Sequence, residues 1–213
     1  MKSSPATLID YGAGNIRSVM GALAFLDQGF QVTSNPEVVK EERCLVLPGV
    51  GSFGSAIENI KARGLDKAIR RAVADGAYIL GICLGMQLLG EGSEEDGGCE
   101  GLGLVPGVCE RFHNRPESPI RIPHMGFNSV TWSENNPLFD RVPTNGDFYF
   151  VHSFRFNDLC AFHKHPIATT DYGGEFVSAY AIEGRICGTQ FHPEISQGNG
   201  LVVLRNFLRR SQC

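Results

Sequence analysis

The residues with the clearest chemical potential close an apolar stretch, in the sequence Gly81-Ile82-Cys83-Leu84-Gly85. The apolar run before Cys83 has the character of a strand, and leucine-rich helical sequence follows it. Glycines two residues before and after a reactive side chain permit a sharp, strained turn that presents it clear of the sheet. Helix N-terminal amides beside such a turn favour a thiolate and leave donors for an oxyanion. The pattern predicts a nucleophilic Cys83, and a buried core cysteine is the competing interpretation.

A second group of reactive residues is His192-Pro193-Glu194, which follows an apolar stretch at residues 185–191. Residues two apart in extended backbone project to the same face, and Pro193 disfavours helical backbone at His192. We therefore expect the imidazole and the carboxylate to lie side by side, as where an acid fixes a histidine that faces a nucleophile. Cys83, His192 and Glu194 would then be nucleophile, base and orienter. A surface ion pair is the alternative.

The remaining histidines and cysteines give weaker signals. His113, His163 and His165 lie in polar sequence typical of loops, whereas His124 and His152 have apolar surroundings and are candidates for core or pocket positions. No histidine pair has convincing metal-ligand spacing. The seven cysteines are scattered and lack CxxC spacing, which predicts neither a zinc site nor a disulfide framework. We expect no metal, no cofactor and a reduced, cytoplasmic chain.

The elements that must position these residues alternate in type along the first half of the chain. Strands are predicted at residues 6–10, 30–33, 44–47 and 77–82, with helices beginning at residues 16 and 65. Strands separated by helices form a parallel sheet covered on both faces, with chemistry at the carboxyl ends of the strands. Cys83 and the glycine-rich loop 48–54 both fall at such ends. Gly12-x-Gly14 lacks the third glycine of a dinucleotide loop, so it is a weak signal.

The second half has a different texture. Short β-like segments at residues 109–112, 128–132 and 148–152 are separated by turns, a last strand is predicted at 185–191, and an amphipathic helix closes the chain. Together these features predict one α/β domain over residues 1–213, with a central, mostly parallel sheet flanked by helices and antiparallel strands added in the second half.

Composition excludes several classes of partner. The chain is 42% hydrophobic and 20% charged, with a formal net charge of -4 and no basic patch, which argues against nucleic acid. The first apolar segment, about five residues long, is too short for an export signal or a membrane span. We therefore expect no membrane association.

Three motifs, taken in chain order, resemble the class I glutamine amidotransferase family: Pro48-Gly49-Val50-Gly51, the segment 81–87, and Phe191-His192-Pro193-Glu194. The resemblance covers essentially the whole chain and implies a flavodoxin-like sheet. Within the family, the segments 10–15, 123–126 and 149–153 are similar to glutaminase subunits that feed a cyclase.

The resemblance implies a role for each candidate residue. Cys83 would attack the carboxamide of L-glutamine to form a thioester, while His192, held by Glu194, transfers the proton that lets the amide nitrogen leave as ammonia. The oxyanion would be stabilised by backbone amides from Gly49, Val50, Gly51 and Leu84. The substrate's amino-acid end would be held by Gln87, Glu95 and the backbone of Ser153 and Phe154.

The resemblance also implies a partner, a (β/α)₈-barrel cyclase that forms a heterodimer and uses the ammonia in histidine biosynthesis. The implied docking residues are Asn15, Met125, Phe127, Tyr149 and Ile195. The family usually has Trp at position 127 and Lys at 195, so Phe127 lacks an indole N–H and Ile195 lacks a cation. A glutaminase that supplies another synthase, for example a sugar-modifying one, is therefore a close alternative.

A non-catalytic, redox-sensing relative that keeps the elbow cysteine is a more distant alternative. Such a protein needs neither a His192–Glu194 pair aligned with the thiol nor the substrate-holding Gln87 and Glu95.

Overall fold

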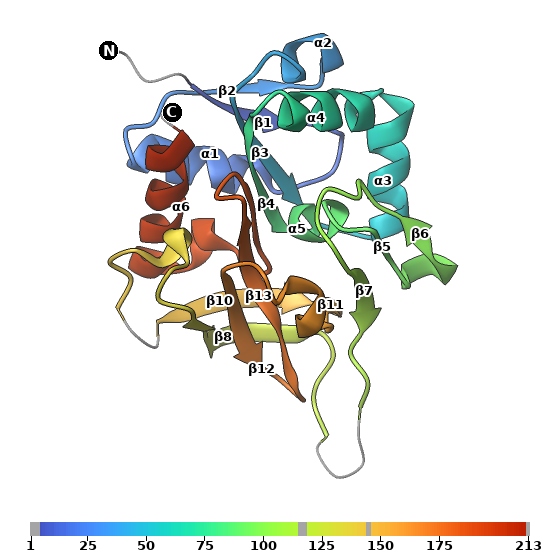
Figure 1. The fold of residues 1–213 in the computed structure, drawn as a ribbon, viewed down its shortest axis with the longest axis vertical. Helices are drawn as coiled ribbons and strands as arrows, with labels where there is room; N and C mark the ends of the chain where they lie inside the picture. The colour runs from blue at the N-terminus through green and yellow to red at the C-terminus, as the bar shows by residue number, and fades with distance from the viewer. Residues whose placement is uncertain (1–4, 115–118, 144–145, 212–213) are drawn as a thin grey trace.

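A mixed β-sheet runs through the molecule, and the part that carries the site is parallel (Figure 1). The computed structural model describes residues 5–114, 119–143 and 146–211. The neighbouring parallel strands, in spatial order, are β2 (Phe30–Thr33), β1 (Ala6–Ile9), β3 (Cys44–Gly49), β4 (Tyr78–Cys83) and β14 (Ile186–Thr189). The predicted parallel arrangement is therefore confirmed for the first half of the chain.

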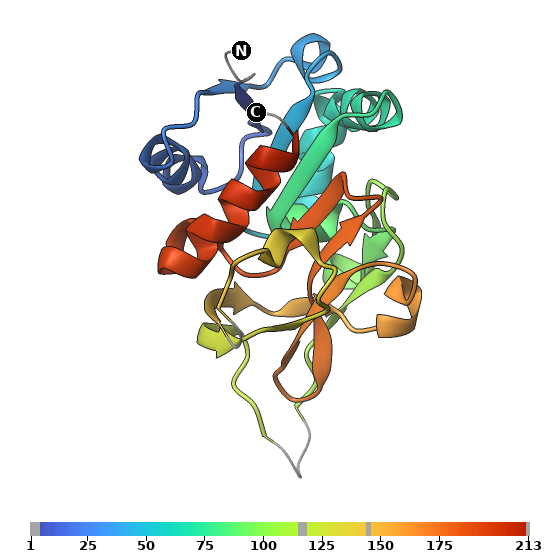
Figure 2. The ribbon, with the colours of Figure 1, turned by 60° about the vertical axis from the view of Figure 1, so that its left-hand side comes forward.

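Helices cover both faces of this parallel sheet (Figures 1 and 2). One face packs against α1 (Ile16–Phe25) and α6 (Gln197–Ser211), and the other against α2 (Pro36–Val39), α3 (Phe53–Ala62) and α4 (Leu65–Ala74). Along β3, Leu45 and Leu47 join the α3–α4 core while Val46 joins the α1–α6 core. Burial on both faces explains the continuous apolar runs of these strands.

The sequence pattern did not predict α3. This helix begins directly after the glycine-rich loop and buries Phe53, Ile57 and Ile60. Glycine and polar residues in its first turns weaken the helical signal, so that tertiary packing decides the local structure.

Antiparallel strands extend the sheet beyond β14, as the second half of the sequence predicts. In spatial order they are β13 (Glu175–Ile182), β11 (Phe154–Phe156), β7 (Val108–Arg111), β5 (Gly92–Ser93) and β6 (Cys99–Glu100). β12 (Ile167–Asp171) pairs with β13, and β9 (Thr131–Trp132) pairs with β12. Among these strands, β5 and β7 depart from the antiparallel pattern, because they run parallel.

A separate two-stranded ribbon is formed by β8 (His124–Ser129) and β10 (Asp147–His152), which are antiparallel. It lies at the end of the molecule remote from the N-terminus (Figure 1). The predicted strand 128–132 is therefore wrong as one element, because β8 ends at Ser129 and β9 belongs to the other sheet. The short helices are α5 (Leu84–Leu88), η1 (Glu95–Gly97), η2 (Pro137–Phe139), η3 (Leu159–Phe162) and η4 (Pro193–Ile195).

The cysteines differ from the expectation at one position. Free thiols are present at Cys83, Cys99, Cys109, Cys160 and Cys187. Cys44 is disulfide-bonded, so the expectation of a fully reduced chain is wrong at this residue. No helix within residues 5–114, 119–143 and 146–211 has the length and apolar character needed to cross a membrane.

Candidate active site

The cysteine elbow has the strained backbone that its flanking glycines predict. Cys83 ends β4 with φ +54° and ψ -111°, a conformation that costs a side-chain-bearing residue about 1–3 kcal/mol. A Cβ atom at Gly85 would lie 1.8 Å from the Leu47 oxygen, and one at Gly81 would lie 2.6 Å from the Gly85 oxygen. Both glycines are therefore required by the close packing of α5 on β3 and β4.

The two strands beside β4 bring the other predicted groups to the thiol. Gly49, at the end of β3, is the register partner of Cys83, so the Gly49–Gly51 loop begins next to the elbow. On the other side β14 runs parallel to β4, and just beyond its end the chain reaches His192. The carboxyl edge of three adjacent strands therefore assembles the site.

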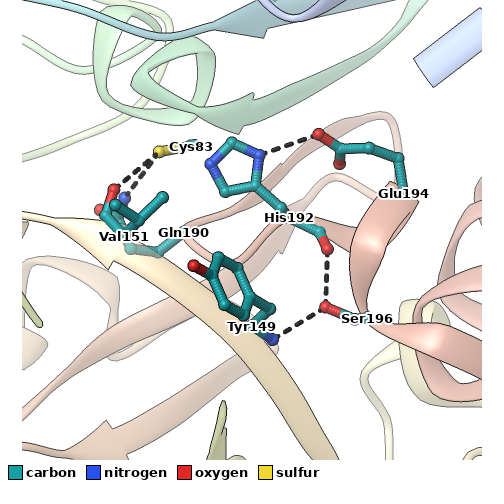
Figure 3. A network of polar contacts seen from close by, with 7 residues as sticks. All are labelled: Cys83, Tyr149, Val151, Gln190, His192, Glu194 and Ser196. Carbon is teal, nitrogen blue, oxygen red and sulfur yellow. Dashed lines mark hydrogen bonds and ion pairs between the residues drawn. The ribbon is translucent and has the colours of Figure 1, made fainter. Parts of the chain in front are cut away.

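His192 and Glu194 form a buried pair beside Cys83. His192 Nδ1 and Glu194 Oε1 are 2.8 Å apart, with the side chains 4% and 1% exposed. His192 Nε2 faces Cys83 (Figure 3) and has no hydrogen-bond partner in the described part of the chain. One ring nitrogen is thus held by the carboxylate and the other is left for the thiol and a substrate.

The predicted contact is confirmed, but the stated reason for it is wrong. Glu194 lies in the 3₁₀ turn η4 rather than in extended backbone, and β14 stops at Thr189. Pro193 opens this turn, and it is the turn that folds the carboxylate back onto the ring.

Opposing effects set the protonation of His192. Burial lowers the pKa of this imidazole, but Cys83 and Glu194 together outweigh burial and raise it from 6.5 to about 10. A raised pKa means that the ring carries its second proton near neutral pH. A protonated ring beside the sulfur favours a thiolate and is ready to donate to a leaving group.

The ribbon strand β10 anchors the backbone of His192. The His192 N–H donates to the Tyr149 carbonyl at 2.9 Å. Ser196 Oγ donates to the His192 carbonyl at 2.6 Å and accepts from the Tyr149 N–H at 2.9 Å (Figure 3). The imidazole is therefore positioned by the ribbon as well as by the parallel sheet.

A pocket of about 450 Å³ opens over Cys83 and His192. Besides these two residues it is lined by Val50, Gly51, Leu84, Gln87, Glu95, Pro123, Val151, His152, Ser153 and Phe154. All four predicted substrate-holding residues are thus brought together, with most of the predicted oxyanion loop. Gly49 and Glu194 are not among the residues that line it.

Two polar side chains of the lining are fixed by the protein. The Gln87 amide donates through Nε2 to the Phe154 carbonyl at 2.9 Å and to Gln190 Oε1 at 2.8 Å. Glu95 Oε2 accepts from the Phe53 N–H at 2.8 Å, at the start of α3. Burial raises the pKa of Glu95, although the Phe53 N–H opposes this shift. A carboxylate held in a pocket that is poor in water suits an ammonium group.

The implied docking residues lie on the surface. Met125 is 62% exposed, Phe127 49% and Ile195 41%, and Asn15 is also exposed. Tyr149 is half-buried, and its ring stands edge-on to that of Phe127 at 5.5 Å between centroids.

Sequence reasoning missed two contacts of the Cys83 thiol and one buried hydroxyl near it. Gln190 Nε2 lies 3.7 Å from Cys83 Sγ, and the Cys83 thiol points to the Val151 carbonyl at 3.8 Å (Figure 3). Tyr11 has a buried hydroxyl with no partner among the described residues, and burial, followed by Cys83, raises its pKa. The contact of Gln190 could have been predicted from its position two residues before His192.

The chain belongs to the family described as glutamine amidotransferase class-I, whose model matches residues 7–211. Two solved structures have a similar fold. One is a glutamine amidotransferase with a TM-score of 0.75 and 17% identity, covering 99% of this chain and 100% of that one. The other is a glutamine amidotransferase from Thermotoga maritima with a TM-score of 0.66 and 14% identity, covering 100% of this chain and 99% of that one.

More similar sequences share one name, imidazole glycerol phosphate synthase subunit HisH. The protein of that name from Sulfurimonas denitrificans is 43% identical, covering 95% of this chain and 96% of its own length. The one from Moorella thermoacetica is 43% identical over 95% and 93%. In Vibrio vulnificus a HisH 2 is 42% identical over 94% and 92%.

Proposed function

We propose that this chain is the glutaminase subunit of an imidazole glycerol phosphate synthase, releasing ammonia from L-glutamine at Cys83. The observation that carries the proposal is the strained Cys83 beside a buried imidazole whose second nitrogen is held by Glu194. The family membership and the HisH relatives support it.

Acylation begins with the thiolate of Cys83, which attacks the side-chain carbonyl carbon of glutamine. The carbonyl oxygen becomes an oxyanion, and the backbone amides of Leu84 and of the Gly49–Gly51 loop are the proposed donors to it. The C–N bond breaks as His192 Nε2–H protonates the leaving nitrogen, so that ammonia departs neutral and the ring becomes neutral. The product on the enzyme is a γ-glutamyl thioester of Cys83.

Deacylation reverses the proton flow. The neutral Nε2 of His192 takes a proton from water while the water oxygen attacks the thioester carbon. The C–S bond then breaks, glutamate leaves, and the thiolate and the protonated ring are restored. Glu194 Oε1 holds the Nδ1 side of the ring throughout and stabilises the charge on it.

The amino-acid end of glutamine is held by the polar lining of the pocket in this proposal. Glu95 would face the substrate ammonium, and the amide oxygen of Gln87, with the backbone of Ser153 and Phe154, would complete that end of the pocket. No step requires a metal or an organic cofactor.

The proposed partner is a (β/α)₈-barrel cyclase that docks on a face formed by Asn15, Met125, Phe127, Tyr149 and Ile195. Exposed apolar side chains on one face are typical of an interaction surface. A heterodimer would let neutral ammonia pass without dilution or protonation. We also propose a cytoplasmic location, where a nucleophilic thiol stays reduced.

The direct test mixes the purified chain with glutamine, with and without a histidine-pathway cyclase, and measures glutamate. We expect release with the cyclase and almost none from Cys83→Ala, which should still bind the partner. Substantial activity in Cys83→Ala would refute the nucleophile. Activity that is unchanged by this cyclase but increases with another synthase would favour a glutaminase that supplies that synthase, the alternative raised by Phe127 and Ile195.

A further inference from the structure

Two buried histidines, His152 in the lining of the pocket and His124 next to it, have no part in the proposed reaction. They are register partners on β8 and β10, and they are only 2% and 6% exposed. His124 Nδ1 and His152 Nε2 are 3.0 Å apart. Within the described ranges, no group of three or more His, Cys, Asp and Glu side chains could hold a metal ion. Hydrogen bonds link the pair to Asn128 on one side and to the Phe154 carbonyl on the other.

The main-chain carbonyl of Phe154 fixes the direction of the hydrogen bonds that join His152 and His124. His152 Nδ1 lies 2.8 Å from the Phe154 oxygen, which can only accept, so Nδ1 carries the proton. His152 Nε2 must then accept from His124 Nδ1–H. By the same logic His124 Nε2 accepts from Asn128 Nδ2, 3.3 Å away.

Each ring therefore holds one proton. This fits the surroundings, because burial lowers the pKa of His124 to about 4 and that of His152 to about 3, and the charge of Arg155 adds to both shifts. A neutral imidazole has one donor and one acceptor, as this arrangement requires.

The Phe154 carbonyl also fixes the direction of the hydrogen bonds that lead through Gln87 and Gln190 to the Cys83 thiol. Gln87 Nε2 donates to the Phe154 oxygen, so the Gln190 atom that faces this amide nitrogen, 2.8 Å away, must be the acceptor Oε1. The Gln190 nitrogen is thereby turned to Cys83 Sγ, 3.7 Å away, and donates to it (Figure 3). A donor aimed at sulfur stabilises the thiolate more than the thiol.

We propose that this hydrogen-bond relay, made of Asn128, His124, His152, Gln87 and Gln190, positions the Gln190 amide against the Cys83 sulfur and so couples the β8–β10 ribbon to the reactivity of the thiol. The three ribbon members act as positioning residues, since only Gln190 touches the nucleophile and only Gln87 is proposed to hold the substrate. The proposal rests on the nucleophilic role of Cys83.

The β8–β10 ribbon connects the exposed surface of the protein to the relay and to the pocket. Asn128 and His124 flank the exposed Met125 and Phe127 on β8, whereas Val151 on β10 contacts the Cys83 thiol. A shift of the ribbon would therefore change both the relay and the wall of the pocket.

The first test removes the final donor. Gln190→Met keeps an unbranched side chain of similar length but cannot donate to sulfur. In the complete complex with the cyclase, we expect kcat for glutamine hydrolysis to fall about tenfold to a hundredfold, the effect of losing one hydrogen bond to a charged group. Alkylation of Cys83 by iodoacetamide should slow about tenfold at neutral pH for the same reason. Alkylation of the exposed Cys160 should not change.

The second test uses a matched pair at the centre of the relay. His152→Leu removes both ring nitrogens. His152→Asn introduces a side chain of nearly the same shape as leucine, but its amide N–H lies near the position of Nδ1 and can still donate to the Phe154 carbonyl. We expect His152→Leu to lower kcat about tenfold with a smaller change in KM, and His152→Asn to stay within about threefold of the parent.

A double-variant cycle separates a relay from a loss of packing. If His152 acts through Gln190, Gln190→Met with His152→Leu should be little slower than Gln190→Met alone. Independent, additive losses would overturn the relay, as would unchanged alkylation of Cys83 in both single variants. Alkylation of the buried Cys109 and Cys187 would show that a variant has unfolded. If His152→Leu unfolds, the kinetics of Gln190→Met and His152→Asn test the relay in its place. A parent complex with no glutaminase activity would instead remove the proposed function itself.

Discussion

Two buried histidine systems lie close together in this protein and behave in opposite ways. His192 has a carboxylate and a thiol as neighbours, and they raise its pKa to about 10 in spite of burial. For His124 and His152, burial is the largest effect and the charge of Arg155 adds to it, so their pKa values fall to about 4 and about 3, although the Phe154 carbonyl opposes the shift of His152. Burial acts on all three rings in the same direction, so it is the neighbouring charges that decide which ring can move a proton.

The largest expected effect comes from removing the charged ring. His192→Ala should lower glutamine hydrolysis by at least about a thousandfold, because it takes away the proton donor to the leaving nitrogen. Ammonia-dependent turnover of the cyclase in the same complex serves as the control and should persist. A loss as small as that of His152→Leu would erase the distinction between the two systems.

A smaller effect is expected when a neutral amide replaces the carboxylate of Glu194. Glu194→Gln keeps the shape and one acceptor, and should slow hydrolysis about tenfold to a hundredfold, since it weakens a hydrogen bond to a charged ring. The pKa of His192 should fall, which moves the alkaline limb of the pH–rate profile to lower pH. Losses equal to those of His192→Ala would assign Glu194 another function.

The pH dependence of folding should separate the two systems by sign. Because the pKa values of His124 and His152 are depressed from 6.5, only the unfolded chain binds their protons as pH falls from about 6.5 toward 4, and stability is lost there. His192 has a raised pKa, so its contribution is full below 6.5 and is lost as pH rises toward 10.

Chemical denaturation of His152→Leu at a series of pH values checks this prediction. Its free energy of unfolding should fall less steeply than that of the parent below pH 6.5, by about 1.4 kcal/mol per pH unit for the one missing proton. Equal slopes for the two proteins would show that His152 is not held neutral.

The smallest expected effect lies at the far end of the relay. His124→Leu should lower kcat only about threefold, since His152 can still donate to Phe154. His124→Asn, which retains a donor near the position of Nδ1, should be closer to the parent. Steady-state kinetics in the complex measures both, and a His124→Leu loss larger than that of Gln190→Met would reverse the proposed direction of action.

Local sequence patterns sufficed for the elements of the parallel sheet and for the nucleophile. The glycines around Cys83 and the apolar runs of β3 and β4 are short-range signals, and the structure has the predicted turn at that place. The His192–Glu194 contact was also predicted, although it arises from a 3₁₀ turn that the extended-strand interpretation did not include.

The relay was out of reach because its contacts join distant parts of the chain. His124 and His152 were recognised only as candidates for core or pocket positions, and no pattern pairs them with Gln87 or Gln190. The β8–β10 register that brings the rings together is a tertiary feature, as is the separation of β8 from β9. Side-chain networks of this kind become visible only when the strands have been placed.

The covalent intermediate gives the most direct test of the central claim. The complex should be quenched in acid during turnover of glutamine, digested and weighed by mass spectrometry. The account predicts that the peptide carrying Cys83 gains the mass of glutamine less ammonia, that His192→Ala loses this adduct, and that no other cysteine carries it. Rapid glutamate release with Cys83 never modified, or an adduct on a different residue, would contradict it.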